Sequence, residues 1–85
     1  MSKQKTRGPA AEKARSNLRL FREQRRLTQE QLGERMALFG LGMSRATVSQ
    51  IESGARRIDV DDLVSFARAL GVSVEVLLGL GEVER

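Results

Sequence analysis

The chain is divided into short segments by residues of the kinds that begin and end helices. Each of the last four apolar segments follows a residue of a type that caps helix N-termini. These residues are Thr28, Ser44, Asp59 and Ser73. Glycines that suit a helix C-terminus follow two of these segments, at positions 54 and 71. Apolar residues recur every three or four positions, and no stretch alternates apolar and polar residues as a strand would. The sequence therefore predicts a compact all-α domain.

Five helices are expected from this pattern. The first covers residues 10–25, where an apolar stripe ends in the stem of Arg25. The second begins at the capping box of Thr28 and Gln31 and is interrupted at residues 40–42, Gly-Leu-Gly. The third runs from Ser44 to Gly54, the fourth from Asp59 to Gly71, and a short fifth helix starts at Ser73.

Each helix supplies a few apolar residues to one small core. In chain order, the residues expected to face inward are Ala14, Leu18, Phe21, Leu32, Met36, Phe39, Val48, Ile51, Leu63, Phe66, Ala67, Leu70, Val76 and Leu77. A chain of 85 residues is close to the size at which a single core is only marginally stable. One domain is therefore predicted, over residues 10–80, between a flexible basic arm at residues 1–9 and a tail at residues 81–85.

The composition excludes several kinds of catalytic chemistry. The chain has no Cys and no His, so thiol nucleophiles, disulfides, histidine general bases and zinc sites of the finger or metalloprotease kind are ruled out. Asp61 and Asp62 are better explained as favourable charges in the first turn of a helix than as a catalytic pair. We expect neither an enzyme nor a bound metal or cofactor.

Charge is distributed unevenly along the chain and points to an anionic partner. Residues 1–15 have a net charge of +4, residues 16–57 also +4, and residues 58–85 have −4. Twelve of the fifteen basic residues are Arg, whose planar guanidinium suits phosphates and guanine edges. No apolar run approaches the length of a membrane span, and no secretory signal is evident at the N-terminus. A cytoplasmic protein without a membrane partner is expected.

Three stretches of the chain resemble the Cro/C1-type (Xre) helix-turn-helix DNA-binding domain. They read Leu-Thr-Gln-Glu-Gln-Leu at 27–32, Ser-Arg-Ala-Thr-Val-Ser-Gln-Ile-Glu-Ser-Gly at 44–54, and Leu63 through Ala-Leu-Gly-Val-Ser at 69–73. The resemblance covers about residues 16–80 and implies a five-helix, lambda-repressor-like fold. It also implies binding to double-stranded DNA, with the third helix as the recognition helix.

Two features depart from the family pattern. Arg26 stands where the family often has a glycine before Leu27. About five extra residues, around 37–41, separate the second helix from the recognition helix. Because Leu38, Phe39 and Leu41 are too apolar for a free loop, we expect these residues to lengthen the second helix rather than to form a simple loop. Phe39 would then be buried, and Leu38 or Leu41 would cover the recognition helix.

The resemblance assigns DNA contacts to particular residues. The expected base contacts are Arg45, Ala46, Thr47, Ser49 and Gln50, and the expected phosphate contacts are Gln29, Ser44, Arg56 and Arg57, with Lys3, Lys5 and Arg7 of the arm. Gln29 is also expected to brace the recognition helix. An Arg in the major groove favours guanine, a Gln favours adenine, and an Ala methyl favours the methyl group of thymine. Arg22 and Glu52 are expected to form a structural ion pair between the first helix and the recognition helix.

One recognition helix reads too few base pairs to specify a unique site, so we expect a homodimer on a palindromic operator. The expected dimer interface includes Val76 and Leu80 of the fifth helix, although these side chains could instead fold back onto the first and fourth helices in a monomer.

The favoured function is that of a transcriptional regulator, and more specifically a repressor. The short chain leaves no room for a ligand-sensing domain, which favours a phage Cro-like or immunity repressor or a restriction-modification controller. The alternative is an antitoxin-like protein-interaction module whose helix-turn-helix only autoregulates its operon.

Overall fold

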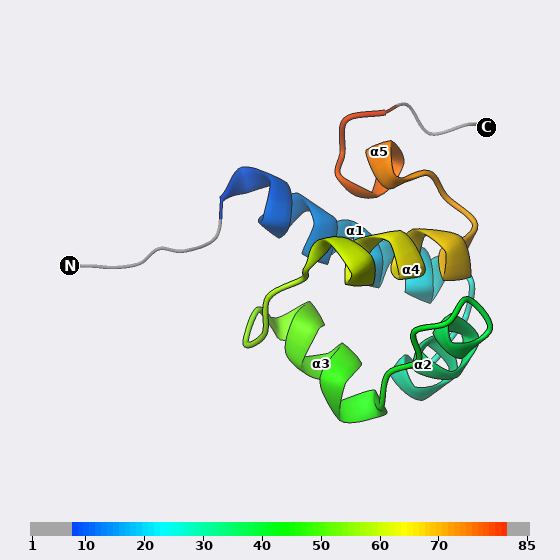
Figure 1. The fold of residues 1–85 in the computed structure, drawn as a ribbon. Coiled ribbons are helices and arrows are strands. Elements are labelled where there is room, and N and C mark those ends of the chain that lie inside the picture. The colour runs from blue at the N-terminus through cyan, green and yellow to red at the C-terminus, as the bar shows by residue number, and fades with distance from the viewer. Residues whose placement is uncertain (1–7, 82–85) are drawn as a thin grey trace.

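The computed structural model describes residues 8–81, which form five helices and no strand. Helix α1 spans Pro9–Gln24, α2 Gln29–Ala37, α3 Arg45–Ser53, α4 Val60–Leu70 and α5 Val74–Leu77. The described part of the chain is therefore all-α, as the sequence predicts. In Figure 1, α4 crosses in front of α1, α2 and α3 lie below this pair, and α5 lies above it. The arm residues 1–7, with Lys3, Lys5 and Arg7, lie outside the described residues.

One core joins all five helices. α2 packs against α3 and α4, α1 packs against α3, α4 and α5, and α5 also contacts α4. The fully buried large side chains come from every helix: Leu18, Leu32, Met36, Val48, Ile51, Phe66, Leu70 and Leu77. Asn17 of α1 fastens α5 by donating hydrogen bonds to the carbonyl oxygens of Val76 (3.4 Å) and Leu77 (3.1 Å). The core thus holds α3 against a rigid support.

The predicted caps are present at the helix ends. Thr28 and Gln31 form a capping box at α2, and Ser44 and Ser73 each accept a hydrogen bond from the backbone three residues on. Asp62, expected only as a favourable charge, is the partner of Asp59 in a second capping box and is buried. Burial raises the pKa of its carboxyl group above the ordinary value.

The prediction that residues 37–41 lengthen the second helix was wrong. Helix α2 ends at Ala37, Phe39 is 45% exposed and Leu38 is 80% exposed, so neither is buried and Leu38 does not cover α3. Gly40 has a φ of +92°, a left-handed conformation that favours glycine. The N–H of Gly40 donates a hydrogen bond to the carbonyl of Ala37, and the N–H of Leu41 donates one to the carbonyl of Met36. These two bonds form a Schellman motif, which ends the helix.

Gly33 lets the chain return from α2 to α3 in close contact with α2. The N–H of Met43 donates to the carbonyl of Gly33 at 3.3 Å, and a Cβ at position 33 would overlap the carbonyl oxygen of Met43. We predict that Gly33→Ala lowers the free energy of unfolding by about 1 to 3 kcal/mol, because the backbone at Met43 has to shift. Urea unfolding measures this change. Glu34→Ala, at an exposed site of the same helix, is the control and should stay within about 0.5 kcal/mol of wild type.

Arg26 takes a backbone conformation in which glycine would be unstrained. It is the one non-glycine residue with positive φ, +58°, in the part of the chain described. This positive φ accounts for the glycine that often stands at this position in the family that the sequence resembles. A residue with a Cβ in the left-handed conformation destabilises the folded state by about 1 to 2 kcal/mol. A glycine avoids this strain but loses more conformational entropy on folding, which costs about half as much.

We therefore predict that Arg26→Gly raises the free energy of unfolding by about 0.5 to 1 kcal/mol. The control is Arg25→Gly, because Arg25 has a φ of −91° and gains nothing from glycine. If thermal or urea unfolding shows both variants destabilised alike, the strain at Arg26 is negligible.

Candidate nucleic-acid interface

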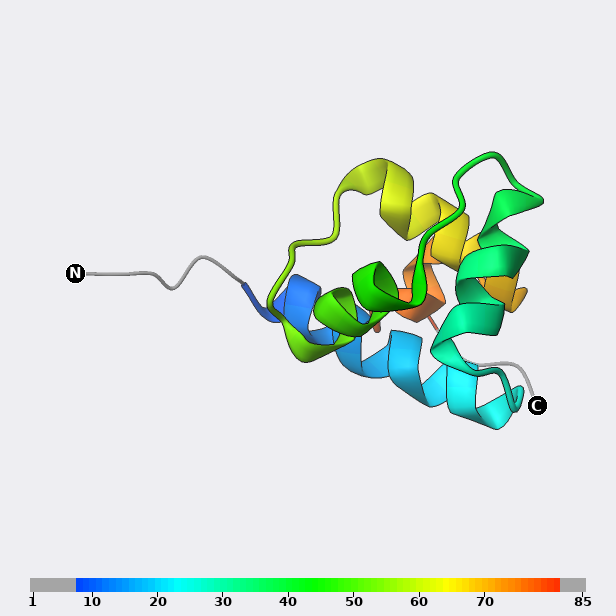
Figure 2. The same ribbon diagram turned by 90° about the horizontal axis from the view of Figure 1, so that it is seen from below.

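Helix α3 is held by its two ends and its inner face. The hydroxyl of Ser44 accepts a hydrogen bond from the N–H of Thr47 at 3.1 Å, and Gly54 ends the helix with a φ of +88°. Val48 and Ile51 point into the core and are fully buried. Viewed from below, α3 lies between α1 and α4 with α2 at its side (Figure 2). Its opposite face is therefore free.

That outer face carries the side chains expected to read bases. Arg45, Ala46 and Gln50 are exposed, and Thr47 and Ser49 are half-buried. The Thr47 hydroxyl lies 3.0 Å from the Ser44 hydroxyl, so it is partly engaged within the N-terminal turn. Positions 45, 46, 49 and 50 fall on one side of a helix with 3.6 residues per turn. Hydrogen-bonding and apolar groups are thus presented together on one surface.

The one acidic residue of α3 is neutralised on the inner side of the helix. Arg22 of α1 donates from Nε to Glu52 Oε2 at 2.6 Å and from Nη2 to Glu52 Oε1 at 3.0 Å. Only 12% of the Arg22 side chain and 6% of the Glu52 side chain are exposed. The hydrogen bonds and charge of Glu52 raise the pKa of Arg22 above its ordinary value. The structure thus brings these two residues together as a bidentate pair.

Gln29 belongs to the same group of side chains. Its Nε2 donates to Glu52 Oε1 at 3.0 Å, while Nη1 of Arg22 donates to the carbonyl of Leu27 at 2.8 Å. Glu52 therefore ties α3 to both α1 and α2. A polar hollow of about 240 Å³ opens beside this group, lined also by Arg19, Ser49 and Ser53. Gln29 lies at the N-terminus of α2, where unpaired backbone amides attract anions.

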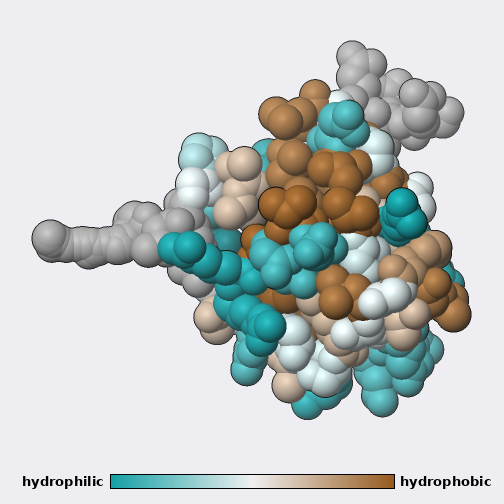
Figure 3. Space-filling model, viewed as in Figure 1, coloured by the Kyte–Doolittle hydropathy of each residue, from teal (hydrophilic) through white to brown (hydrophobic). Residues whose placement is uncertain are grey.

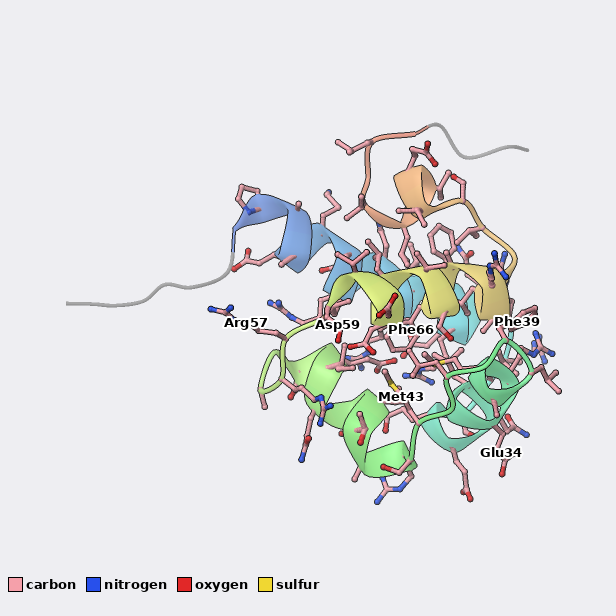
Figure 4. All side chains as sticks on the ribbon, viewed as in Figure 1. Glu34, Phe39, Met43, Arg57, Asp59 and Phe66 are labelled. Atoms are coloured by element: carbon pink, nitrogen blue, oxygen red, sulfur yellow. The ribbon has the colours of Figure 1, made fainter. Side chains whose placement is uncertain are left out.

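The loop after α3 adds positive charge near its C-terminal end. Arg56 and Arg57 are exposed, and the N–H of Arg56 donates to the carbonyl of Gln50 at 3.1 Å. In Figure 4, Arg57 projects away from the body of the domain. The loop is therefore fastened to α3 by its backbone while its guanidinium groups remain available.

Arg15 was missed as a functional candidate. Its guanidinium packs over Gly54, where an added Cβ would lie 3.2 Å from Nε, so it reaches the same end of α3 as Arg56. Arg19 also borders the polar hollow and pairs with Glu23 at 3.2 Å. The spacing of Arg15, Arg19 and Arg22 places all three on one side of α1, which was the sequence signal available.

The residues expected at a dimer interface lie on the other side of the domain. Leu80 was expected on the fifth helix, but α5 ends at Leu77 and Leu80 follows it, 76% exposed. Val76 is half-buried and packs on the core, and Leu77 is 1% exposed. Figure 3 shows a continuous apolar area over α5 and between α5 and α4. The structure therefore separates Val76 and Leu80 from the outer face of α3.

Within residues 8–81, no group of acidic side chains is arranged to hold a metal ion, and no helix has the length and apolar character needed to cross a membrane. Searches of curated proteins and of solved structures found no match to this chain. The family model described as helix-turn-helix domain matches residues 16–80, from the middle of α1 to the residues that follow α5. The chain therefore belongs to the helix-turn-helix domain family.

Proposed function

We propose that this protein is a sequence-specific transcriptional regulator that inserts α3 into the major groove of double-stranded DNA. The observation that carries the proposal is the outer face of α3, which presents Arg45 and Gln50, while the carboxylate of Glu52 is 6% exposed and paired with Arg22. A helix fits the major groove, where each base pair has a distinct pattern of donors and acceptors. An unpaired carboxylate on this face would repel the phosphates.

The proposed contacts divide into base reading and positioning. Arg45 reads guanine, Gln50 reads adenine and Ala46 contacts a thymine methyl, with Thr47 and Ser49 beside them. Gln29, Ser44, Arg56 and Arg57 hold the phosphate backbone. We add Arg15 to the phosphate set, because it lies at the same end of α3 as Arg56.

We further propose a homodimer on an inverted repeat and a repressor role. Two recognition helices are needed to specify a site among many competitors. The exposed Leu80, just after α5, and the half-buried Val76 support the dimer, and the resemblance of residues 16–80 to Cro/C1-type domains favours repression. Selection of bound sequences from a random duplex library tests the whole proposal. A palindromic consensus supports it, and the absence of any enriched sequence overturns it.

Base reading makes a separate prediction for Arg45 and Gln50. Arg45→Ala and Gln50→Ala should each weaken binding to the selected site by about 1 to 3 kcal/mol and relax preference at one base pair per half-site. Affinity for random DNA should hardly change. Arg35→Ala and Gln24→Ala are matched controls at exposed positions outside α3. Equal losses on selected and random DNA would show that Arg45 and Gln50 do not read bases.

A further inference from the structure

The turn between α2 and α3 exposes apolar side chains that the core does not use. Leu38 is 80% exposed and Phe39 is 45% exposed, at the tip of the turn closed by Gly40. In Figure 4, Phe39 lies at the edge of the domain beside the C-terminal half of α4. We call residues 38–40 the ridge.

A groove runs along α4 next to the ridge. It consists of two hollows of about 340 and 420 Å³, both lined by Phe39 and Arg68. Leu41, Asp61 and Val64 line the first hollow, and Arg35 and Leu38 line the second. We call this surface the α4 groove. The ridge and the groove lie side by side on the same face, so a copy related by a two-fold axis would bring each ridge to the other groove.

The charges of the groove fit such a copy. Asp61 lies near the start of α4 and Arg68 near its end, about 10 Å apart at 1.5 Å per residue. Neither side chain forms an ion pair within residues 8–81. When two α4 helices lie antiparallel, Asp61 of each meets Arg68 of the other, with Val64 of both copies between the pairs.

We propose that the α4 groove binds a second copy of this chain by an isologous contact, in which Leu38 and Phe39 of each copy enter the groove of the other. This contact is distinct from the α5 interface of the proposed function. α5 lies on one side of α4 and the ridge lies on the side of α2 (Figure 1). A chain that uses both surfaces joins dimers into larger assemblies, and on DNA it couples the occupancy of neighbouring operators.

A charge exchange tests the contact in the full-length chain. In sedimentation equilibrium, Asp61→Arg and Arg68→Asp should each weaken the groove-mediated association at least tenfold, because like charges then face each other. The double variant reverses both pairs and should restore association to within about threefold of wild type. Glu34→Arg makes the same change in charge as Asp61→Arg, but outside the groove, and is its control. Leu38→Glu should weaken association without affecting the core, because Leu38 is exposed.

The same series separates this contact from the proposed dimer and from DNA binding. In a Leu80→Glu background, groove-mediated dimers should persist and should respond to the charge exchange in the same way. The double variant leaves the net charge unchanged, so one chain of it should bind a half-site duplex with wild-type affinity. Rescue by the double variant supports the contact even where no DNA site is found. Association that is weakened by none of Asp61→Arg, Arg68→Asp and Leu38→Glu, or single and double variants that associate equally weakly, overturns it.

Discussion

Glu52→Ala is expected to lower the free energy of unfolding by about 3 to 5 kcal/mol, the cost of leaving a buried charge without its partner. The Arg22 side chain, 12% exposed in the intact domain, would lose two of its hydrogen bonds, and Gln29 would lose its acceptor. Because small domains have only about 5 to 15 kcal/mol of stability in total, this single change removes a large part of it. Urea denaturation followed by circular dichroism measures the loss.

Two matched variants separate charge from shape in this bridge. Glu52→Gln retains an oxygen that can accept from Arg22 but removes the charge, so its loss should fall between wild type and Glu52→Ala. Glu23→Ala breaks the exposed pair with Arg19, in which 67% and 54% of the side chains are exposed, and should cost only about 0.2 to 1 kcal/mol. If Glu52→Ala costs no more than Glu23→Ala, the bridge orients α3 without stabilising the domain.

The helix boundaries could be predicted closely from the sequence because their signals are local. Thr28, Ser44, Asp59 and Ser73 all proved to be N-terminal caps, and Gly54 and Gly71 end their helices with positive φ. A cap needs only a side-chain oxygen and a backbone N–H two or three residues later. Such signals do not depend on the rest of the fold.

The segment at 37–41 could not be predicted in the same way because two signals conflict there. The apolar character of Leu38 and Phe39 favours a buried helix, whereas Gly40 favours a helix end. The backbone follows the glycine signal and leaves the helix, so the ring of Phe39 lies half-exposed beside α4. Periodicity shows that a residue is suited to burial, but it does not show that a neighbouring element has room to cover it.

The side-chain network around the recognition helix was only partly accessible from the sequence. The pairing of Arg22 with Glu52 and the bracing of the recognition helix by Gln29 both followed from the family resemblance, whereas the choice of Glu52 as the acceptor for Gln29 required the structure. Arg15 reaches Gly54 across two elements that are far apart in the chain. Contacts of this kind depend on helix packing angles, which capping and periodicity do not encode.

In a Leu38→Glu background, where the groove contact is removed, Leu80→Glu and Val76→Glu are each expected to convert a dimer into a monomer and to weaken binding to a full palindromic site at least a hundredfold. Loss of the dimer removes the linkage between two half-sites, which contributes about 10²- to 10⁴-fold in affinity. Leu80 is the cleaner site because it is 76% exposed, whereas Val76 also packs on the core. Sedimentation in a Leu38→Glu background isolates the α5 contact from the groove.

The control for these variants is Leu20→Glu, which places the same charge on a 47% exposed leucine of α1. It should leave both the association state and the helicity unchanged. Leu77 is fully buried and held near Asn17, so Leu77→Glu should instead unfold the end of the domain. A wild-type chain that sediments as a monomer, both free at micromolar concentration and on the full palindrome, would show that α5 serves only the core. In that case Val76 and Leu80 would contribute to stability alone, and Leu80→Glu would have no effect on DNA binding.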